Sequence, residues 1–161
     1  MARHDKTSTP ETRDICRNRR AFHDYEVLER LECGLVLTGT EVKSLRAGGV
    51  SIEDAYATVQ DGEVWLVGSD IPEYAMGNYM NHKRNRARKV LLHRREIAKF
   101  ADRADQRGFS LIPLRLYFKN GKAKVELALC KGKQLHDKRQ ALKQADASRE
   151  IKREMARHRR G

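Results

Sequence analysis

The sequence predicts a mainly β fold with some α structure: an OB-like six-stranded β-barrel with flanking short helices and a basic C-terminal tail. Two dipeptides, Asp61-Gly62 and Asn120-Gly121, each join two β-rich runs. Such pairs favour tight hairpins because both turn positions need a positive φ. About six short β-rich runs and two helical segments fit into 161 residues, a length that allows one domain and its tails.

The first half of the predicted domain contains a strand and a helix. Residues 22–37 alternate loosely and end in an apolar run, which predicts a long strand interrupted or bulged at Gly34. A short helix should follow, with Thr38 or Thr40 as its N-cap and Gly48 as its stop.

Two hairpins, a single strand and a second helix complete the predicted domain. The first hairpin joins runs 53–60 and 63–71, and a short strand is expected at 88–92. Apolar residues at helical spacing predict a helix within 93–108, and residues 109–132 form the second hairpin. Aromatic residues of these β runs are expected in the core or half-core: Trp65, Tyr117 and Phe118.

The two ends of the chain differ from the domain between them. Residues 1–17 mix charged residues with Ser, Thr and Pro without periodicity, so we expect a disordered lead-in to a domain of residues 18–130. Residues 131–161 form a basic tail with a thin apolar stripe that includes Ile151 and Met155. Because so narrow a stripe does not hold an isolated helix, we expect a tail that is disordered when free and helical when bound.

The charge of the chain points to a polyanionic partner. Lys and Arg number 34 against 22 Asp and Glu, a formal net charge of +12. The excess lies in two zones, residues 82–95 with seven basic and no acidic residues, and the tail from Lys131. One such run is usually a solvated face, but two in a small β-barrel favour nucleic acid, RNA above all.

Several other classes of protein are disfavoured. Three separated cysteines form no metal-ligand or disulfide pattern, and we expect no cofactor, no metal and no enzyme activity. A ribonuclease that uses His82 or His136 is a distant alternative. No apolar run of membrane-spanning length and no signal peptide are present, so we expect a cytoplasmic protein that does not bind membranes.

Within the first basic zone, Arg86, Arg88 and Lys89 precede an apolar run. Strand alternation would place the two arginines on one face, where their guanidinium groups could bridge adjacent phosphates. The alternative is a pair of surface arginines without a partner. In the tail, His136 lies among basic residues and could stack on an unpaired base.

Five strings, in this order and spacing, closely resemble the SmpB family of SsrA-binding proteins: NRRAFHDYEV, LECGLVLTGTEVKSLRAG, RARKVLLHRREI, LYFKNGKAKVELAL and KGKQLHDKR. The resemblance runs from about Asn18 to the C-terminus. It implies an OB-like barrel that binds the tRNA-like domain of transfer-messenger RNA and carries it to stalled ribosomes. It also implies a tail that occupies the empty messenger channel, next to small-subunit RNA at the decoding centre.

The resemblance also assigns roles to residues and suggests partners. The positions it associates with RNA binding are Asn18, Glu32, Leu91 and Lys124. Arg86, Arg88 and Lys89 lie in an adjoining matching segment, and with Arg19 they complete the predicted RNA-binding residues. The positions it associates with the ribosome are Gly132, Lys133, His136, Asp137, Lys138, Arg139, Ile151 and Met155. Elongation factor and alanyl-tRNA synthetase would be partners only through the RNA, and the protein would act as a monomer. The alternative is an OB-fold ribosome-associated protein that binds ribosomal RNA without transfer-messenger RNA.

Two segments depart from the family pattern. GKQLHDKR has Gln134 and Leu135 where a basic and a polar residue are usual, which weakens the charge at the start of the tail. HKRNRARK has Lys83 and Arg84 in place of an Asp-Pro pair, so we expect a more basic and more flexible loop there.

Overall fold

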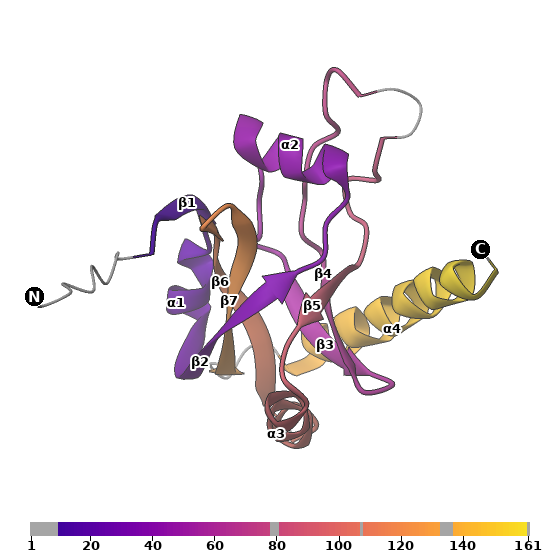
Figure 1. The fold of residues 1–161 in the computed structure, drawn as a ribbon. Helices are drawn as coiled ribbons and strands as arrows, with labels where there is room; N and C mark the ends of the chain where they lie inside the picture. Colours follow the sequence, from indigo (N-terminus) through magenta and orange to yellow (C-terminus); the bar gives the residue numbers. More distant parts are fainter. Residues whose placement is uncertain (1–9, 78–80, 107, 133–136, 161) are drawn as a thin grey trace, which may run out of the picture.

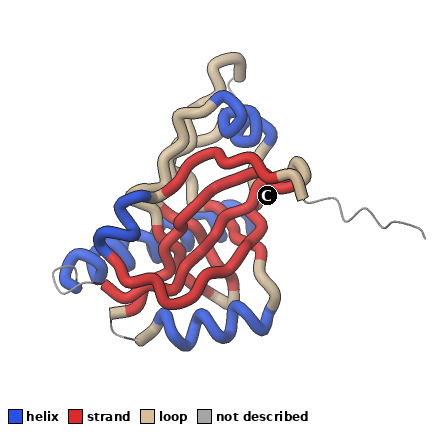
Figure 2. The backbone as a smooth tube through the Cα atoms, turned by 90° about the vertical axis from the view of Figure 1, so that its left-hand side faces the viewer, coloured by secondary structure: helices blue, strands red, loops and turns tan. Residues whose placement is uncertain are grey.

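The computed structural model describes residues 10–77, 81–106, 108–132 and 137–160, with the backbone alone at 137–142 and 160. The strands are β1 (Thr12–Arg17), β2 (Tyr25–Leu35), β3 (Tyr56–Gln60), β4 (Glu63–Val67), β5 (Arg88–Leu91), β6 (Phe109–Lys119) and β7 (Lys122–Gly132). The helices are α1 (Arg19–Asp24), α2 (Gly39–Ala47), α3 (Arg94–Ala104) and α4 (Asp137–Arg160). Figure 1 shows α2 and α3 at opposite ends of the strands, and Figure 2 shows the helices around the outside of the strands.

The strands form one antiparallel sheet in the order β1-β6-β3-β4-β5-β2-β7, and β6 also pairs with β7. The pairings therefore lead from β6 through five other strands and back to β6, while β1 is added at the side of β6. This arrangement leaves an interior that is filled by side chains of all the strands that take part.

The N-terminal part of the chain differs from the prediction in two ways. Residues 12–17 are not a disordered lead-in but form β1, because they pair with residues 115–119 of β6. The predicted strand over 22–37 begins only at Tyr25, since residues 19–24 form α1. The bulge of β2 lies between Val27 and Glu29 rather than at Gly34.

The predicted helix after β2 and both hairpins are confirmed. Thr38 caps α2 in a capping box with Glu41, and Gly48 ends the helix with φ +94°. The turn dipeptides Asp61-Gly62 and Asn120-Gly121 have positive φ at both positions, as a two-residue hairpin loop requires.

The main core lies inside the sheet and a smaller cluster lies under α4. The main core contains alternate residues of the strands, among them Cys33, Val90, Leu116 and Val125. The smaller cluster joins Trp65, Val67 and Ala87 of the sheet region to Ala147 and Ile151 of α4. All three cysteines are free thiols.

Helix α4 packs against the protein's own sheet, beside β3 (Figure 1). Ile151 is fully buried there, and the Tyr56 hydroxyl donates a hydrogen bond to the carbonyl of Lys143. The sequence predicts that this tail is helical only when it is bound to a surface. In the structure, that surface belongs to the same chain and includes Trp65, Val67 and Ala87. Among the described residues, none of the helices is long and apolar enough to cross a membrane.

Candidate nucleic-acid interface

Three of the predicted RNA-binding residues, Glu32, Leu91 and Lys124, lie together on the outer face of the sheet. Leu91 of β5 and Lys124 of β7 both stand opposite Gly34 of β2, one on each side. Glu32 lies two residues from Gly34 on the same strand and therefore points to the same face. The sheet thus places an apolar, a basic and an acidic side chain side by side.

Gly34 makes this face flat between its two neighbours. A Cβ atom at this position would lie 3.2 Å from Cβ of Leu91, so the glycine leaves room for the leucine to lie over β2. Leu91 is 52% exposed. An exposed leucine beside a lysine fits a ribose or base that carries a phosphate.

The Glu32 carboxylate is exposed but held in place. Oε2 accepts a hydrogen bond from the Tyr117 hydroxyl, and Oε1 accepts one from Lys119 Nζ at 3.0 Å. The Tyr117 hydrogen bond, with the charges of Lys119 and Lys124, lowers the pKa of Glu32 against a smaller opposing effect of burial. The site therefore presents an ionised, oriented acceptor near neutral pH.

Tyr117 lies beneath these polar side chains. Its ring is 1% exposed, and the Arg115 guanidinium lies 4.1 Å from the ring centroid. Arg115 in turn is paired with Asp14 of β1 at 3.2 Å. Burial and then the neighbouring Glu32 raise the pKa of Tyr117, so its hydroxyl stays protonated and remains a donor.

Three basic residues that precede Leu91, namely Arg86, Arg88 and Lys89, are paired with carboxylates of the protein itself. Arg88 is fully buried and forms an ion pair with the buried Glu41, which also pairs with Arg86 at 2.5 Å. Lys89 pairs with Glu63 at 3.0 Å. The prediction that Arg86 and Arg88 bridge phosphates is therefore wrong for Arg88, and Arg86 is largely covered as well.

The buried Glu41 explains this outcome. Its burial opposes ionisation, but the hydrogen bonds and charges of Arg88 and Arg86 together lower its pKa. A buried charge is tolerated when it is paired and hydrogen-bonded in this way. Sequence reasoning places Glu41 in the first turn of a helix and gives no sign of its two arginine partners, which lie more than forty residues away.

Asn18 also has a structural role here. It is 1% exposed, its Oδ1 caps α1 by accepting from the backbone N–H of Ala21, and its amide donates to the carbonyls of Ile52 and Pro113. Arg19, the next residue, is exposed. Of this pair only Arg19 is open to a ligand in the structure.

The tail residues fall into three groups. Gly132 ends β7, and Lys133 and His136 lie outside the described residues. The backbone of Asp137, Lys138 and Arg139 opens α4. Farther along α4, Ile151 is buried and Met155 is partly buried against the sheet.

Of the two histidines named in the ribonuclease alternative, His136 lies outside the described residues and His82 is a packing residue. His82 is 7% exposed, with Nδ1 2.9 Å from Thr40 Oγ1 and Nε2 3.0 Å from the carbonyl of Ile71. In the part of the chain that the structure describes, no three His, Cys, Asp or Glu side chains lie close enough to hold a metal ion.

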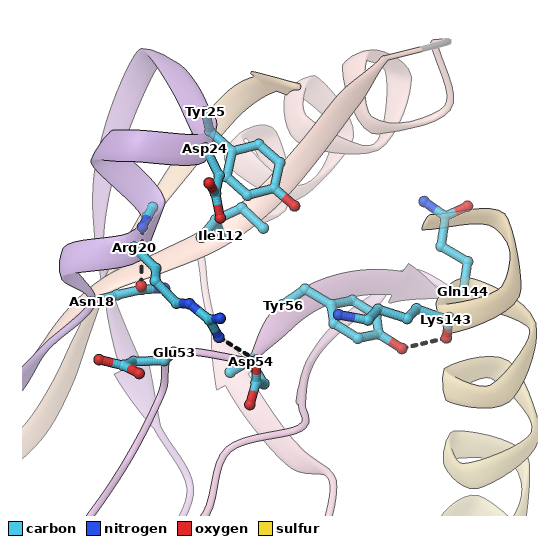
Figure 3. A pocket seen from close by; sticks show the side chains of 12 residues that line it. Asn18, Arg20, Asp24, Tyr25, Glu53, Asp54, Tyr56, Ile112, Lys143 and Gln144 are labelled. Atoms are coloured by element: carbon cyan, nitrogen blue, oxygen red, sulfur yellow. Dashed lines mark hydrogen bonds and ion pairs between the residues drawn. The ribbon is translucent and has the colours of Figure 1, made fainter. Parts of the chain in front are cut away.

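A cavity of about 260 Å³ separates α1 from the start of α4 (Figure 3). Arg20 crosses its edge to pair with Asp54 at 3.3 Å, and Tyr56 closes it on the side of Lys143. Among the residues that line this cavity, Tyr56 and Lys143 join the body to α4.

Comparisons with known proteins agree on one family. The model of the "SmpB protein" family matches residues 15–157. An SsrA-binding protein of Saccharopolyspora erythraea is 58% identical over 147 residues, which cover 91% of this chain and 93% of that one. An SsrA-binding protein of Syntrophobacter fumaroxidans is 48% identical over 153 residues, 95% of each chain. A chain of a solved structure described as "tmRNA-SmpB: a journey to the center of the bacterial ribosome" is 43% identical with a TM-score of 0.64, and the likeness covers 81% of this chain and 95% of that one.

Proposed function

The chain belongs to the SmpB family, and from this premise we propose that it is an RNA-binding adaptor of trans-translation. In this role the sheet binds the tRNA-like domain of transfer-messenger RNA, and the tail acts on the stalled ribosome to which the RNA is delivered. The names of its relatives and of its structural neighbour support this proposal, since they describe SsrA-binding proteins and a tmRNA-SmpB complex at the bacterial ribosome.

The observation that carries the RNA-binding half is the shared face of Glu32, Leu91 and Lys124 around Gly34. Each supplies a different contact: Lys124 a phosphate contact, Leu91 an apolar contact to a sugar or base, and Glu32 an acceptor for a base amino group or a ribose 2′-hydroxyl. A carboxylate repels phosphates, so its presence favours recognition of particular donors over attraction to any polyanion.

The tail half of the proposal requires α4 to leave the sheet. The residues proposed to contact the ribosome, Ile151 and Met155, are the ones that pack on Trp65 and its neighbours here. They cannot make both contacts at once. Release of α4 would therefore uncover Trp65, which is 4% exposed with the helix in place.

Other features belong to the same proposal. The return of the strand pairings to β6 supports an OB-like barrel. We further propose that the protein acts as a cytoplasmic monomer without cofactor, metal or catalytic step. Elongation factor and alanyl-tRNA synthetase would then reach it through the RNA.

The test is binding of the full chain to a transcript of the tRNA-like domain and to an unstructured RNA of equal length, across a salt series. We expect a preference for the structured RNA that survives physiological salt, because part of the affinity comes from directed contacts. Lys124→Ala and Glu32→Ala should each reduce that preference. Lys152→Ala, which removes an exposed charge from α4, is the matched control and should bind as the wild type does.

Two results would contradict the proposal. Equal binding of both RNAs that collapses with salt would leave only a basic protein and favour binding to ribosomal RNA at large. An effect of Lys152→Ala as large as that of Lys124→Ala would place RNA binding on the tail.

A further inference from the structure

We propose that Tyr117 is a positioning residue of the RNA-binding face: it holds the Glu32 carboxylate in the orientation that receives a donor from the RNA, and β1 stabilises it through Asp14 and Arg115. This inference rests on the proposed function and adds to it a residue that does not itself touch the RNA.

The position of Tyr117 in the sheet is the first argument. The residues before and after it, Leu116 and Phe118, point into the main core, whereas Tyr117 is a member of none of the apolar clusters. It points to the outer face, in register with Lys124 on one side and with Asp14 on the other. Its 1% exposure therefore comes from polar side chains that cover it, not from core packing.

The hydrogen bonds around Glu32 are the second argument. Each carboxylate oxygen has one donor, the Tyr117 hydroxyl on Oε2 and Lys119 on Oε1. A carboxylate oxygen accepts about two hydrogen bonds, so each keeps one lone pair for a ligand. The amine of Lys119 lies at the end of a long, flexible side chain. The Tyr117 hydroxyl is instead fixed by a rigid, buried ring, so it determines the direction in which the free lone pairs of the Glu32 carboxylate point.

The support beneath the ring is the third argument. The Arg115 guanidinium lies over the ring, 4.1 Å from its centroid, and is itself paired with Asp14 at 3.2 Å. The chain of contacts runs from β1 through β6 to β2. Part of the RNA-binding face is therefore held in place by β1, a strand that the sequence does not predict.

The experiment measures binding of the tRNA-like transcript by Tyr117→Phe in the full chain, over a range of pH. The phenylalanine keeps the ring and the Arg115 contact and removes only the hydroxyl. We expect about tenfold weaker binding. Because the carboxylate loses the hydrogen bond that most favours its ionised form, the decline of affinity toward acid pH should begin at a higher pH than in the wild type.

Two further variants separate positioning from general structure. Tyr56→Phe also removes one tyrosine hydroxyl, that of the partly buried ring that contacts Lys143, and should leave RNA binding and its pH dependence unchanged. In a Glu32→Ala background the Tyr117 hydroxyl has no carboxylate to hold, so adding Tyr117→Phe should have little further effect.

The results distinguish the inference from the proposed function. The inference would be overturned if Tyr117→Phe bound the RNA as well as the wild type does, or if the effects of Tyr117→Phe and Glu32→Ala simply added. Loss of binding by Lys124→Ala would still support the proposed function in either case. Unchanged binding by both Glu32→Ala and Lys124→Ala would overturn the two together.

Discussion

Replacing Ile151 by alanine should release α4 from the sheet without unfolding the domain. Ile151 is fully buried against Trp65, Val67 and Ala87, and it is the largest fully buried side chain among those described in α4. Alanine is a better helix former than isoleucine. A release would therefore come from lost packing and not from a weaker helix.

The magnitude follows from the few groups that hold the helix. Truncation of a fully buried isoleucine to alanine costs about 2–5 kcal/mol. Burial of a large apolar side chain contributes about 1.5–3 kcal/mol. Among the α4 side chains that the structure describes, Ile151 and part of Met155 pack against the sheet beside the small Ala147. A loss of 2 kcal/mol changes the docking equilibrium by about 30-fold, enough to favour the released helix.

The assay is the fluorescence emission of Trp65, because Trp65 is the only tryptophan of the chain and lies under α4 with 4% of its surface exposed. In Ile151→Ala its emission should shift to longer wavelength and become open to quenching by acrylamide, while the unfolding midpoint of the domain stays close to that of the wild type. Lys152→Ala, on the exposed side of α4, is the control and should keep the wild-type spectrum. An unchanged Trp65 spectrum in Ile151→Ala would refute the account of how α4 is held.

Three further predictions concern stability. Glu41→Gln leaves the buried Arg88 without its counter-charge and should lower the free energy of unfolding by about 3–5 kcal/mol in urea titrations; a loss below 1 kcal/mol would contradict the pairing. Because the folded-state pKa of Glu41 is lowered, its contribution is present above the usual carboxyl pKa and is lost as pH falls through the lowered value, so the wild type should lose more stability toward acid than Glu41→Gln does. In Gly68→Ala the new Cβ would lie 2.8 Å from the carbonyl oxygen of Asp54, whereas in the control Gly48→Ala, at a similar positive φ, the new Cβ meets open space. Calorimetry should therefore show the larger fall in melting temperature for Gly68→Ala. Equal falls would show that the close contact is relieved at no cost.

Local signals in the sequence predicted the local parts of the fold. The two hairpin dipeptides need positive φ wherever they occur, and Thr38 and Gly48 satisfy the unpaired groups at the two ends of α2 whatever packs around it. β1 carries no such signal, because its strand conformation depends on pairing with β6, about a hundred residues later. The bulge predicted at Gly34 is absent for a related reason. The glycine leaves room for Leu91 on the neighbouring strand, a contact that the local sequence does not reveal.

The candidate site was predictable only in part. Charge drew attention to the basic run, where the partner of Arg88 proved to be Glu41 and not phosphate, since counting charges gives no information on distant pairing. Glu32, Leu91 and Lys124 came from the family resemblance, and their adjacency depends on strand register. Tyr117, expected in the core or half-core, is buried on the outer face of β6, because a bulge between Pro113 and Arg115 changes the alternation along that strand.

The pairing of β1 with β6 also protects the protein from association with itself. β6 is an eleven-residue strand of mostly buried residues, and β1 occupies the backbone N–H and C=O groups of residues 115–119 on one of its sides. Without β1, residues 115–119 of β6 would form a free sheet edge. Free edges allow the sheets of separate molecules to pair with each other and to aggregate. The charged side chains of β1, including Arg13 and Arg17, instead present a border that a second sheet does not readily extend.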